Sequence, residues 1–127
     1  MTLKPSKRIL LVEDNEANIE LIQDFLMAHH YSVTVANTGL RAIDSVQSHS
    51  YDLILMDVQM PEMDGLEATR RIRQLPNGAE VPIFALTSFA MSDDRERCLL
   101  AGMNEYMSKP LSLKELLALI ERYLQRP

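Results

Sequence analysis

Short apolar runs alternate along the chain with longer stretches in which apolar residues recur at helical spacing. The runs are nearly continuous, which is typical of strands buried on both faces of a parallel sheet. The predicted strands are 8–13, a segment around Val33 and Val35, 53–57, 81–87 and 105–108. The apolar positions of the intervening helices include Ile19, Ile22, Phe25 and Leu26; Leu40, Ile43 and Val46; Leu99 and Leu100; and Leu113, Leu116, Leu117, Ile120 and Leu124.

Turn and capping residues separate these segments. Asp14 and Asn15 can cap the first helix, and Asp64-Gly65 precedes a helix through Ile72. A helix is predicted from about Ser92 to Gly102, and 75–80 is predicted to be a surface loop. The alternation predicts a doubly wound α/β fold, (βα)5, in which helices cover both faces of a parallel sheet in a three-layer sandwich.

Length and composition narrow the possibilities further. The chain has 127 residues, which predicts one domain over 1–127 with a core of about 7–125. The net charge is −5 and the basic residues are scattered, so direct nucleic-acid binding is not expected. Cys98 is the single cysteine, which fits a reducing compartment and a packing role. No signal peptide or membrane-spanning apolar run is recognisable, so we expect a cytoplasmic protein without membrane insertion.

Polar residues follow four of the predicted strands at the point where each ends. They are Glu13, Asp14, Asp57, Thr87 and Lys109. In doubly wound sheets the carboxyl ends of the strands form the ligand site. Three carboxylates brought together repel one another unless a cation neutralises them, and an oxygen-only ligand set suits Mg²⁺ better than zinc. The sequence therefore predicts a Mg²⁺ site at this edge.

The same residues predict phosphoryl chemistry. An aspartate can act as a nucleophile towards phosphorus, and Asp57 is the best candidate because it directly follows a buried strand. Lys109 supplies a compact positive charge for a phosphoryl oxygen, and the Thr87 hydroxyl can donate a hydrogen bond to another. The three histidines, His29, His30 and His49, lie at predicted helix ends and are assigned to the solvated surface.

Four sequence motifs closely resemble those of the receiver domain of two-component response regulators. They lie at 11–15, 55–65, 85–88 and 106–110. The motifs read Leu-Val-Glu-Asp-Asn, Leu-Met-Asp-Val-Gln-Met-Pro-Glu-Met-Asp-Gly, Ala-Leu-Thr-Ser and Tyr-Met-Ser-Lys-Pro. The resemblance covers nearly the whole chain. It implies a flavodoxin-like sheet of strand order 2-1-3-4-5. It also implies a phosphoacceptor signalling switch in a two-component phosphorelay.

The resemblance also assigns roles residue by residue. Asp57 is implied as the phosphoacceptor, receiving its phosphoryl group from a phosphohistidine donor. The metal ligands implied are Asp14 and Asp57 directly, Glu13 largely through water, and the backbone carbonyl of Gln59, with Mn²⁺ able to replace Mg²⁺. Thr87 and Tyr106 are implied as switch residues that remodel the face formed by the fourth helix, fifth strand and fifth helix. The Lys109-Pro110 peptide is expected to be cis.

Such a domain is a regulator and not an enzyme, apart from self-catalysed phosphoryl transfer and slow autodephosphorylation. Its implied partners are a sensor histidine kinase or histidine phosphotransfer protein and a downstream protein target. Segments 60–65 and 95–103 are similar to receivers of hybrid histidine kinases, so a stand-alone regulator and an excised domain both stay open. Phe89, two residues after Thr87, is expected to affect phosphate lifetime, with the sign left open.

Three alternatives use related features. A haloacid-dehalogenase-type phosphatase also has an aspartate nucleophile, but its usual second aspartate is replaced here by Gln59. A flavodoxin-like mononucleotide carrier needs a phosphate-binding glycine cluster, which the four glycines do not form. A receiver scaffold that works without phosphorylation would not need to retain all the acidic residues.

Overall fold

The computed structural model describes residues 6–88 and 94–125, and within these ranges strands and helices alternate as predicted. The elements are β1 (Arg8–Val12), α1 (Glu16–Ala28), β2 (Ser32–Ala36), α2 (Gly39–Ser48), β3 (Leu53–Asp57), α3 (Gly65–Ile72), the 3-10 turn η1 (Pro76–Gly78), β4 (Ile83–Thr87), α4 (Asp94–Ala101), β5 (Glu105–Ser108) and α5 (Leu113–Leu124). Ser92, where the sequence predicted α4 to begin, and Phe89 lie outside the described residues.

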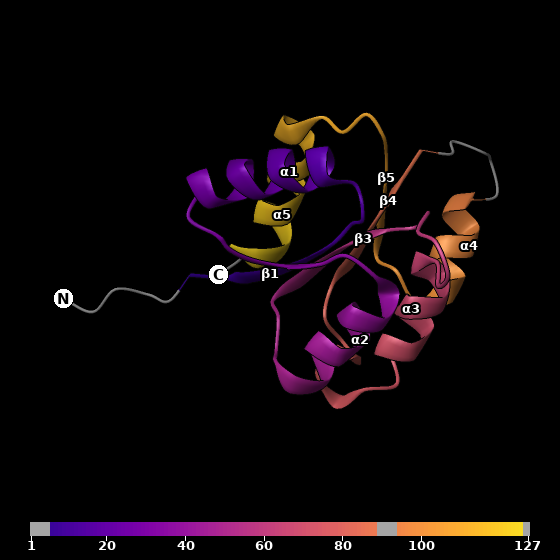
Figure 1. Cartoon of the computed structure of the whole chain (residues 1–127). Coiled ribbons are helices and arrows are strands. Elements are labelled where there is room, and N and C mark those ends of the chain that lie inside the picture. Colours follow the sequence, from indigo (N-terminus) through magenta and orange to yellow (C-terminus); the bar gives the residue numbers. More distant parts are fainter. Residues whose placement is uncertain (1–5, 89–93, 126–127) are drawn as a thin grey trace.

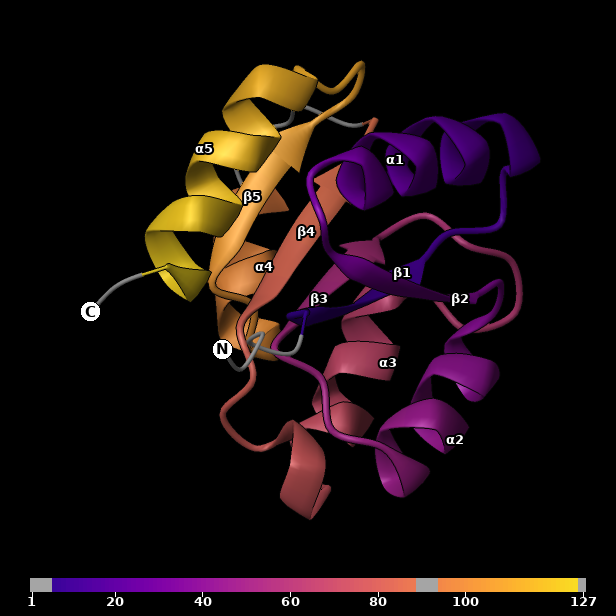
Figure 2. The ribbon, with the colours of Figure 1, turned by 90° about the vertical axis from the view of Figure 1, so that its left-hand side faces the viewer.

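The five strands form one parallel sheet of order β2-β1-β3-β4-β5. Figures 1 and 2 show α1 and α5 together on one face of this sheet and α2, α3 and α4 on the other. Strand order therefore reverses between β1 and β3, which begin the two halves of the sheet. The predicted fold class and strand order are confirmed.

Alternate residues of each strand fill two separate cores. On β1, Ile9 and Leu11 pack towards α1 and α5, whereas Leu10 and Val12 pack towards α2 and α3. Every residue of β3 and β4 is buried. A strand covered on both faces needs apolar side chains at successive positions, which is why the central strands read as continuous apolar runs.

Side chains cap four of the helices at their first turn. Asn15, Thr38, Asp64 and Ser112 each accept a hydrogen bond from the backbone N–H three residues later. These bonds satisfy donors that the helix itself leaves unpaired. Asn15, rather than Asp14, is the cap of α1, which leaves the Asp14 carboxylate available at the sheet edge. Within the described part, no helix is both long and apolar enough to traverse a bilayer.

Two local features differ from the sequence prediction. The segment 75–80 was predicted to be a plain surface loop, but it contains η1, and Gly78 is buried against Ile72. A Cβ at Gly78 would lie 2.1 Å from the Ile72 carbonyl oxygen, so only glycine permits this close approach. On α2, Leu40 was predicted to share an apolar face with Ile43 and Val46, but it is 53% exposed. On α4, Cys98 is buried as predicted, together with Ala101, whereas Leu99 and Leu100 are exposed.

Arg73, just after α3, ties together three segments at the edge of the sheet opposite to the carboxyl ends. Its guanidinium donates to the carbonyl oxygens of Gly102, Gly78 and Val81 and to the side-chain oxygen of Asn104, at 2.6–2.9 Å. Partial burial lowers the pKa of Arg73, but the acceptors on every side keep its donors satisfied. This contact joins α3 to the C-terminal end of α4.

Replacement of Arg73 is expected to destabilise the fold more than replacement of a neighbouring arginine. Arg73→Ala leaves buried carbonyl groups without donors and should lower the free energy of unfolding by about 2–4 kcal/mol. Arg70→Ala, which removes only an exposed ion pair with Glu67, should cost less than about 0.5 kcal/mol. Urea unfolding followed by far-UV circular dichroism measures both. Equal losses for the two variants would contradict the structural role of Arg73.

Candidate functional site

Strand register brings the predicted polar residues to one edge of the sheet. Val12 pairs with Met56, so Glu13 and Asp57 are the next residues on neighbouring strands. Asp57 in turn pairs with Leu86, which places Thr87 one step further along β4. Thr87 pairs with Ser108, and Lys109 follows directly. The predicted convergence of these side chains at the carboxyl edge is therefore what the structure shows.

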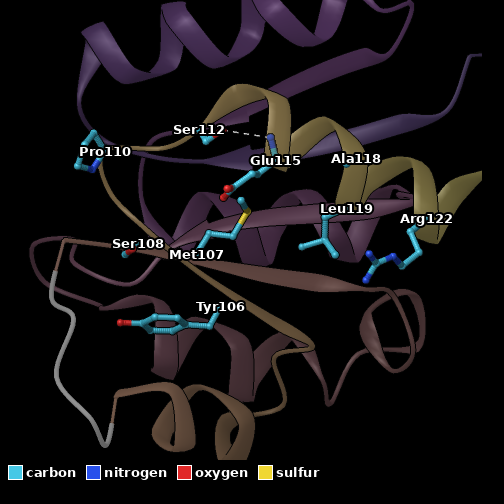
Figure 3. Close-up of a pocket in the computed structure, with 9 residues that line it drawn as sticks. All are labelled: Tyr106, Met107, Ser108, Pro110, Ser112, Glu115, Ala118, Leu119 and Arg122. Carbon is cyan, nitrogen blue, oxygen red and sulfur yellow. Dashed lines mark hydrogen bonds between the residues drawn. The ribbon is translucent and has the colours of Figure 1, made fainter.

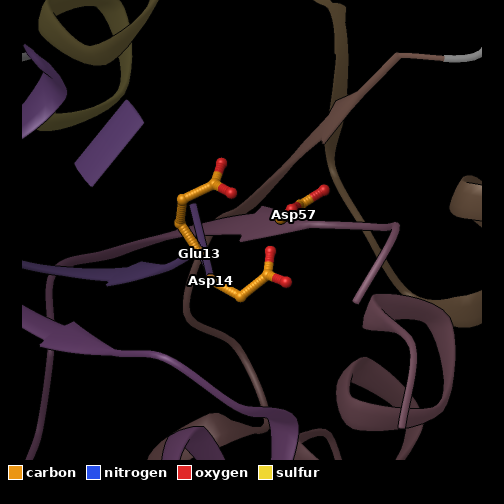
Figure 4. A group of neighbouring side chains, drawn as sticks. All are labelled: Glu13, Asp14 and Asp57. Atoms are coloured by element: carbon orange, nitrogen blue, oxygen red, sulfur yellow. The ribbon is translucent and has the colours of Figure 1, made fainter. Parts of the chain in front are cut away.

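Three carboxylates form a compact cluster at this edge (Figure 4). Glu13, Asp14 and Asp57 each offer an oxygen, and these oxygens lie within 4.8 Å of one another. Glu13 is 0% and Asp57 2% exposed, whereas Asp14 is exposed. Two buried acids and one solvent-facing acid thus border a single small space.

Lys109 provides the positive charge of the cluster. Its Nζ lies 2.8 Å from Glu13 Oε1 and 3.5 Å from Asp57 Oδ2. The Lys109 backbone N–H donates to the Thr87 carbonyl at 2.7 Å, and the Lys109–Pro110 peptide is cis, as predicted. The closer contact with Glu13 was not predicted, because it joins residues 96 positions apart that no sequence motif links.

The pKa of Asp57 is raised to about 7, and burial is the largest cause. The neighbouring Glu13 carboxylate also contributes to the rise, whereas the Gln59 backbone N–H and the Lys109 ammonium oppose it. Desolvation and like charge thus outweigh the two favourable contacts. Without a metal ion, Asp57 therefore holds its proton to a much higher pH than an ordinary aspartate does.

The loop between β3 and α3 holds Asp57 from its other side. The Gln59 backbone N–H donates to Asp57 Oδ1 at 3.0 Å, and the Gly65 N–H donates to the Val58 carbonyl at 3.0 Å. A Cβ at Gly65 would lie 2.4 Å from the Asp57 carbonyl oxygen, so a larger residue would push α3 away from the strand end. The Gln59 side-chain oxygen also accepts from the Ser88 N–H at 3.1 Å, a contact not predicted from the sequence.

Thr87 and Tyr106 lie on the adjacent strands β4 and β5. Thr87 lies beside the carboxylate cluster, and Tyr106 lies further from it. Thr87 is 2% exposed at the end of β4. Tyr106 is half-buried on β5 and packs against the core beneath α2, α3 and α4, and burial raises its pKa. Figure 3 shows the Tyr106 ring on the opposite side of β5 from Met107, which faces α5. The two predicted switch residues are therefore placed on neighbouring strands, with Tyr106 on the α4 side.

The donor set of the cluster suits a hard divalent cation. The described residues that converge on it offer carboxylate oxygens and no thiolate or imidazole, a set that favours Mg²⁺ over zinc. The three histidines are exposed, as predicted, and Cys98 is buried in the core at 2% exposure. A bound dication would also relieve the repulsion that raises the pKa of Asp57.

Comparison with known sequences places this site in a known context. The model of the response regulator receiver domain matches residues 9–121. The chain is 40% identical over 119 residues to the polar-differentiation response regulator DivK of Brucella ovis, covering 94% of this chain and 97% of that protein. The DivK protein of Brucella anthropi is also 40% identical, over 118 residues.

Solved structures agree with these matches. The receiver domain of the sensor histidine kinase PA1611 from Pseudomonas aeruginosa PAO1, described with a magnesium ion in its active-site cleft, superposes with a TM-score of 0.88 at 45% identity. That match covers 95% of this chain and 99% of that one. The chemotaxis protein CheY4 of Vibrio cholerae gives 0.89 at 26% identity, covering 94% and 99%. Fold, motif positions and full-length matches all lead to one assignment: the chain belongs to the response regulator receiver domain family.

Proposed function

We propose that this receiver domain is a phosphoacceptor switch in which Asp57 takes a phosphoryl group from a phosphohistidine. The observation that carries the proposal is the burial of Asp57 at the end of β3, between two other carboxylates and the Lys109 ammonium. An Asp57 oxygen attacks phosphorus, the phosphorus–nitrogen bond breaks, and its electron pair returns to the donor imidazole. Later attack by water releases inorganic phosphate and restores the carboxylate.

The residues around Asp57 divide the work of positioning and charge stabilisation. Lys109 can turn from Glu13 to an incoming phosphoryl oxygen, since its Nζ already lies 3.5 Å from Asp57. The Thr87 hydroxyl, at the end of the adjacent strand, is suited to donate to a second oxygen. The Gln59 backbone N–H holds one Asp57 oxygen, which leaves the other oxygen to act as nucleophile.

Mg²⁺ is proposed to bind to Asp14, Asp57 and the Gln59 backbone carbonyl directly, and to Glu13 through water. Mn²⁺ is expected to be able to substitute for Mg²⁺. When bound, the ion offsets the charge that otherwise keeps the carboxylate and the phosphoryl group apart. Receiver domains act with histidine kinases or phosphotransfer proteins, and we assign the phosphoryl donor of this chain to that class. The phosphatase alternative has no support in the geometry, because Gln59 provides no acid group two residues after Asp57.

The output of the switch is proposed to be the face formed by α4, β5 and α5. A hollow of about 510 Å³ lies there between β5 and α5, and its lining runs along α5 from Ser112 to Arg122 (Figure 3). Its lining includes Tyr106, Ser108, Glu115 and Arg122, so it offers polar and charged groups to a downstream protein. Because Tyr106 belongs both to this hollow and to the core beside α4, movement of its ring would alter both.

The acceptor assignment can be tested by intact-mass spectrometry. With acetyl phosphate and Mg²⁺, the protein should gain the mass of one phosphoryl group in an adduct that hydroxylamine removes. Asp57→Asn should gain none, because an amide oxygen is a far weaker nucleophile, and chelation of Mg²⁺ should suppress the adduct in the parent. Asp52→Asn, which removes another carboxylate at the opposite end of β3, is the matched control and should be modified normally. Equal modification of Asp57→Asn would refute the assignment.

The raised pKa of Asp57 predicts how stability depends on pH in the metal-free protein. The folded state keeps a proton that the unfolded chain releases near its ordinary pKa of 3.8, so it binds more protons between about pH 4 and 7. Asp57 therefore makes the free energy of unfolding fall as pH rises through this window, by at most about 1.4 kcal/mol per pH unit.

Urea unfolding at several pH values, with and without Mg²⁺, measures this dependence. Asp57→Asn should show a shallower decline than the parent, and saturating Mg²⁺ should reduce the decline in the parent because it stabilises the ionised carboxylate. Parent and variant curves that stay parallel from pH 4 to 7 would show that Asp57 does not titrate there.

Hydrogen exchange tests the proposed output face. Phosphorylation of Asp57 should change amide exchange in β5 and the first turn of α5, because Thr87 and Tyr106 link the site to that face. Amides of α2, on the other side of the sheet from α5, should change little and serve as the internal reference. Unchanged exchange in β5 and α5 of a fully phosphorylated sample would place the output elsewhere.

A further inference from the structure

The side chain of Gln59 connects the two loops that border Asp57. Its Oε1 accepts a hydrogen bond from the Ser88 backbone N–H at 3.1 Å, while its own backbone N–H donates to Asp57 Oδ1 at 3.0 Å. One residue therefore contacts both the candidate acceptor and the residue that follows Thr87. The metal-binding role proposed for Gln59 uses its backbone carbonyl, so the side-chain contact with Ser88 serves a different purpose.

Only one of the two polar atoms of the Gln59 amide has a hydrogen-bond partner among the described residues. Gln59 Nε2 is buried and has no hydrogen-bond partner among the described residues. A buried donor without an acceptor costs free energy, so the amide is held in this position by its oxygen alone. A side chain that satisfies one of its two polar ends is a natural candidate for a second arrangement.

Room for a second arrangement lies directly beside it. Gln59 lines a cavity of about 190 Å³ together with Thr87, Asp64 and Asp94. Asp64 caps α3 through one oxygen and Asp94 forms a long ion pair with Arg97, at 3.7 Å. Because a carboxylate has several acceptor positions, either one can also accept a hydrogen bond from an amide nitrogen that turns into the cavity.

The Ser88 N–H lies close to the Asp57 site, because it donates to the side chain of Gln59, whose own N–H donates to Asp57. Ser88 lies beyond the end of β4, so its N–H donates to a side chain of the Asp57 loop rather than to a strand of the sheet. Val58 N–H donates to the Leu86 carbonyl, which keeps the carboxyl ends of β3 and β4 close together. The Gln59 oxygen thus occupies a donor that an oxygen of a phosphoryl group on Asp57 would otherwise accept from.

We propose that the Gln59 side chain is a latch on the Ser88 N–H that holds the resting state and is displaced by the incoming phosphoryl group. On displacement the amide turns into the cavity, where Nε2 gains a carboxylate acceptor that it lacks at rest. Gln59 is then a positioning residue, which acts through the backbone N–H of Ser88. The inference rests on the proposed function, since it concerns how the same site accepts its ligand.

Two substitutions remove the latch in different ways. Gln59→Met keeps the length of the side chain but has no strong acceptor, and Gln59→Asn keeps the amide but is one methylene too short to reach Ser88. Either change should speed amide exchange at Ser88 about fivefold, the equivalent of one typical hydrogen bond. Gln59→Glu keeps an acceptor and should preserve the parent exchange rate. Gln47→Met, the same change at an exposed position on α2, is the matched control.

The functional consequence is measured with beryllofluoride, a tetrahedral mimic of a phosphoryl group, in the presence of Mg²⁺. In the parent, the new contact of Nε2 offsets only part of the lost Ser88 contact. Because Gln59→Met and Gln59→Asn have no Ser88 contact to lose, they should bind beryllofluoride about twofold to threefold more tightly than the parent and Gln47→Met. Faster Ser88 exchange together with unchanged or weaker binding would show that the Gln59 contact only stabilises the local structure, and it would overturn the latch. Unchanged Ser88 exchange in both variants would overturn it as well.

Failure of the latch is distinguishable from failure of the proposed function. If the parent forms the hydroxylamine-labile adduct on Asp57 but the variants bind beryllofluoride no more tightly, the phosphoacceptor assignment holds and only the latch is wrong. If the parent forms no adduct and binds no beryllofluoride, the proposed function fails and the latch on this ligand fails with it.

Discussion

Repulsion between carboxylates that the sheet forces together is the constraint on which this molecule depends. Glu13 and Asp57 are buried on neighbouring strands, and Asp14 lies beside them with its carboxylate in solvent. A fold optimised for stability alone would not bring these groups together. Lys109 offsets part of the repulsion, but it contacts Glu13 more closely than Asp57 and leaves the pKa of Asp57 near 7. The carboxyl edge of the sheet therefore carries negative charge that Lys109 does not fully neutralise, and a bound dication or a proton would neutralise the remainder.

Much of the fold could be predicted from the sequence because its two layers of helices impose a simple pattern. A strand such as β3 that is buried on both faces must be apolar at every position up to Asp57, and this run is visible without a structure. Conversely, Leu40 fits the helical pattern of Ile43 and Val46 yet is exposed, since the pattern shows that a helix forms but not how far its packed face extends. The 3-10 turn η1 was missed because it depends on the close approach of Gly78 to Ile72.

The candidate site was predictable in its members but not in its contacts. Residues that follow parallel strands meet at one edge, so Asp57, Thr87 and Lys109 could be grouped from their spacing alone. The pairing of Lys109 with Glu13, and the bond between Gln59 and the Ser88 N–H, depend on rotamers and on distances across strands. No local pattern encodes such contacts. The Arg73 contacts were missed for the same reason, because their acceptors are backbone carbonyls, which every residue carries.

The two ends of the sheet differ in how well their polar groups are satisfied, and this difference accounts for where change can occur. At one end Arg73 has five hydrogen bonds that join α3 to the C-terminal end of α4, so that end resists movement. At the other end, Gln59 Nε2 has no hydrogen-bond partner within residues 6–88 and 94–125, and Asp57 is buried beside like charge. A ligand that supplies charge and acceptors there interacts with groups at the carboxyl ends of β3 and β4, where polar groups are least satisfied. Arg73 holds Gly102, just after the C-terminal end of α4. Movement of α4 in response to such a ligand is therefore expected chiefly at its N-terminal end, near Asp94.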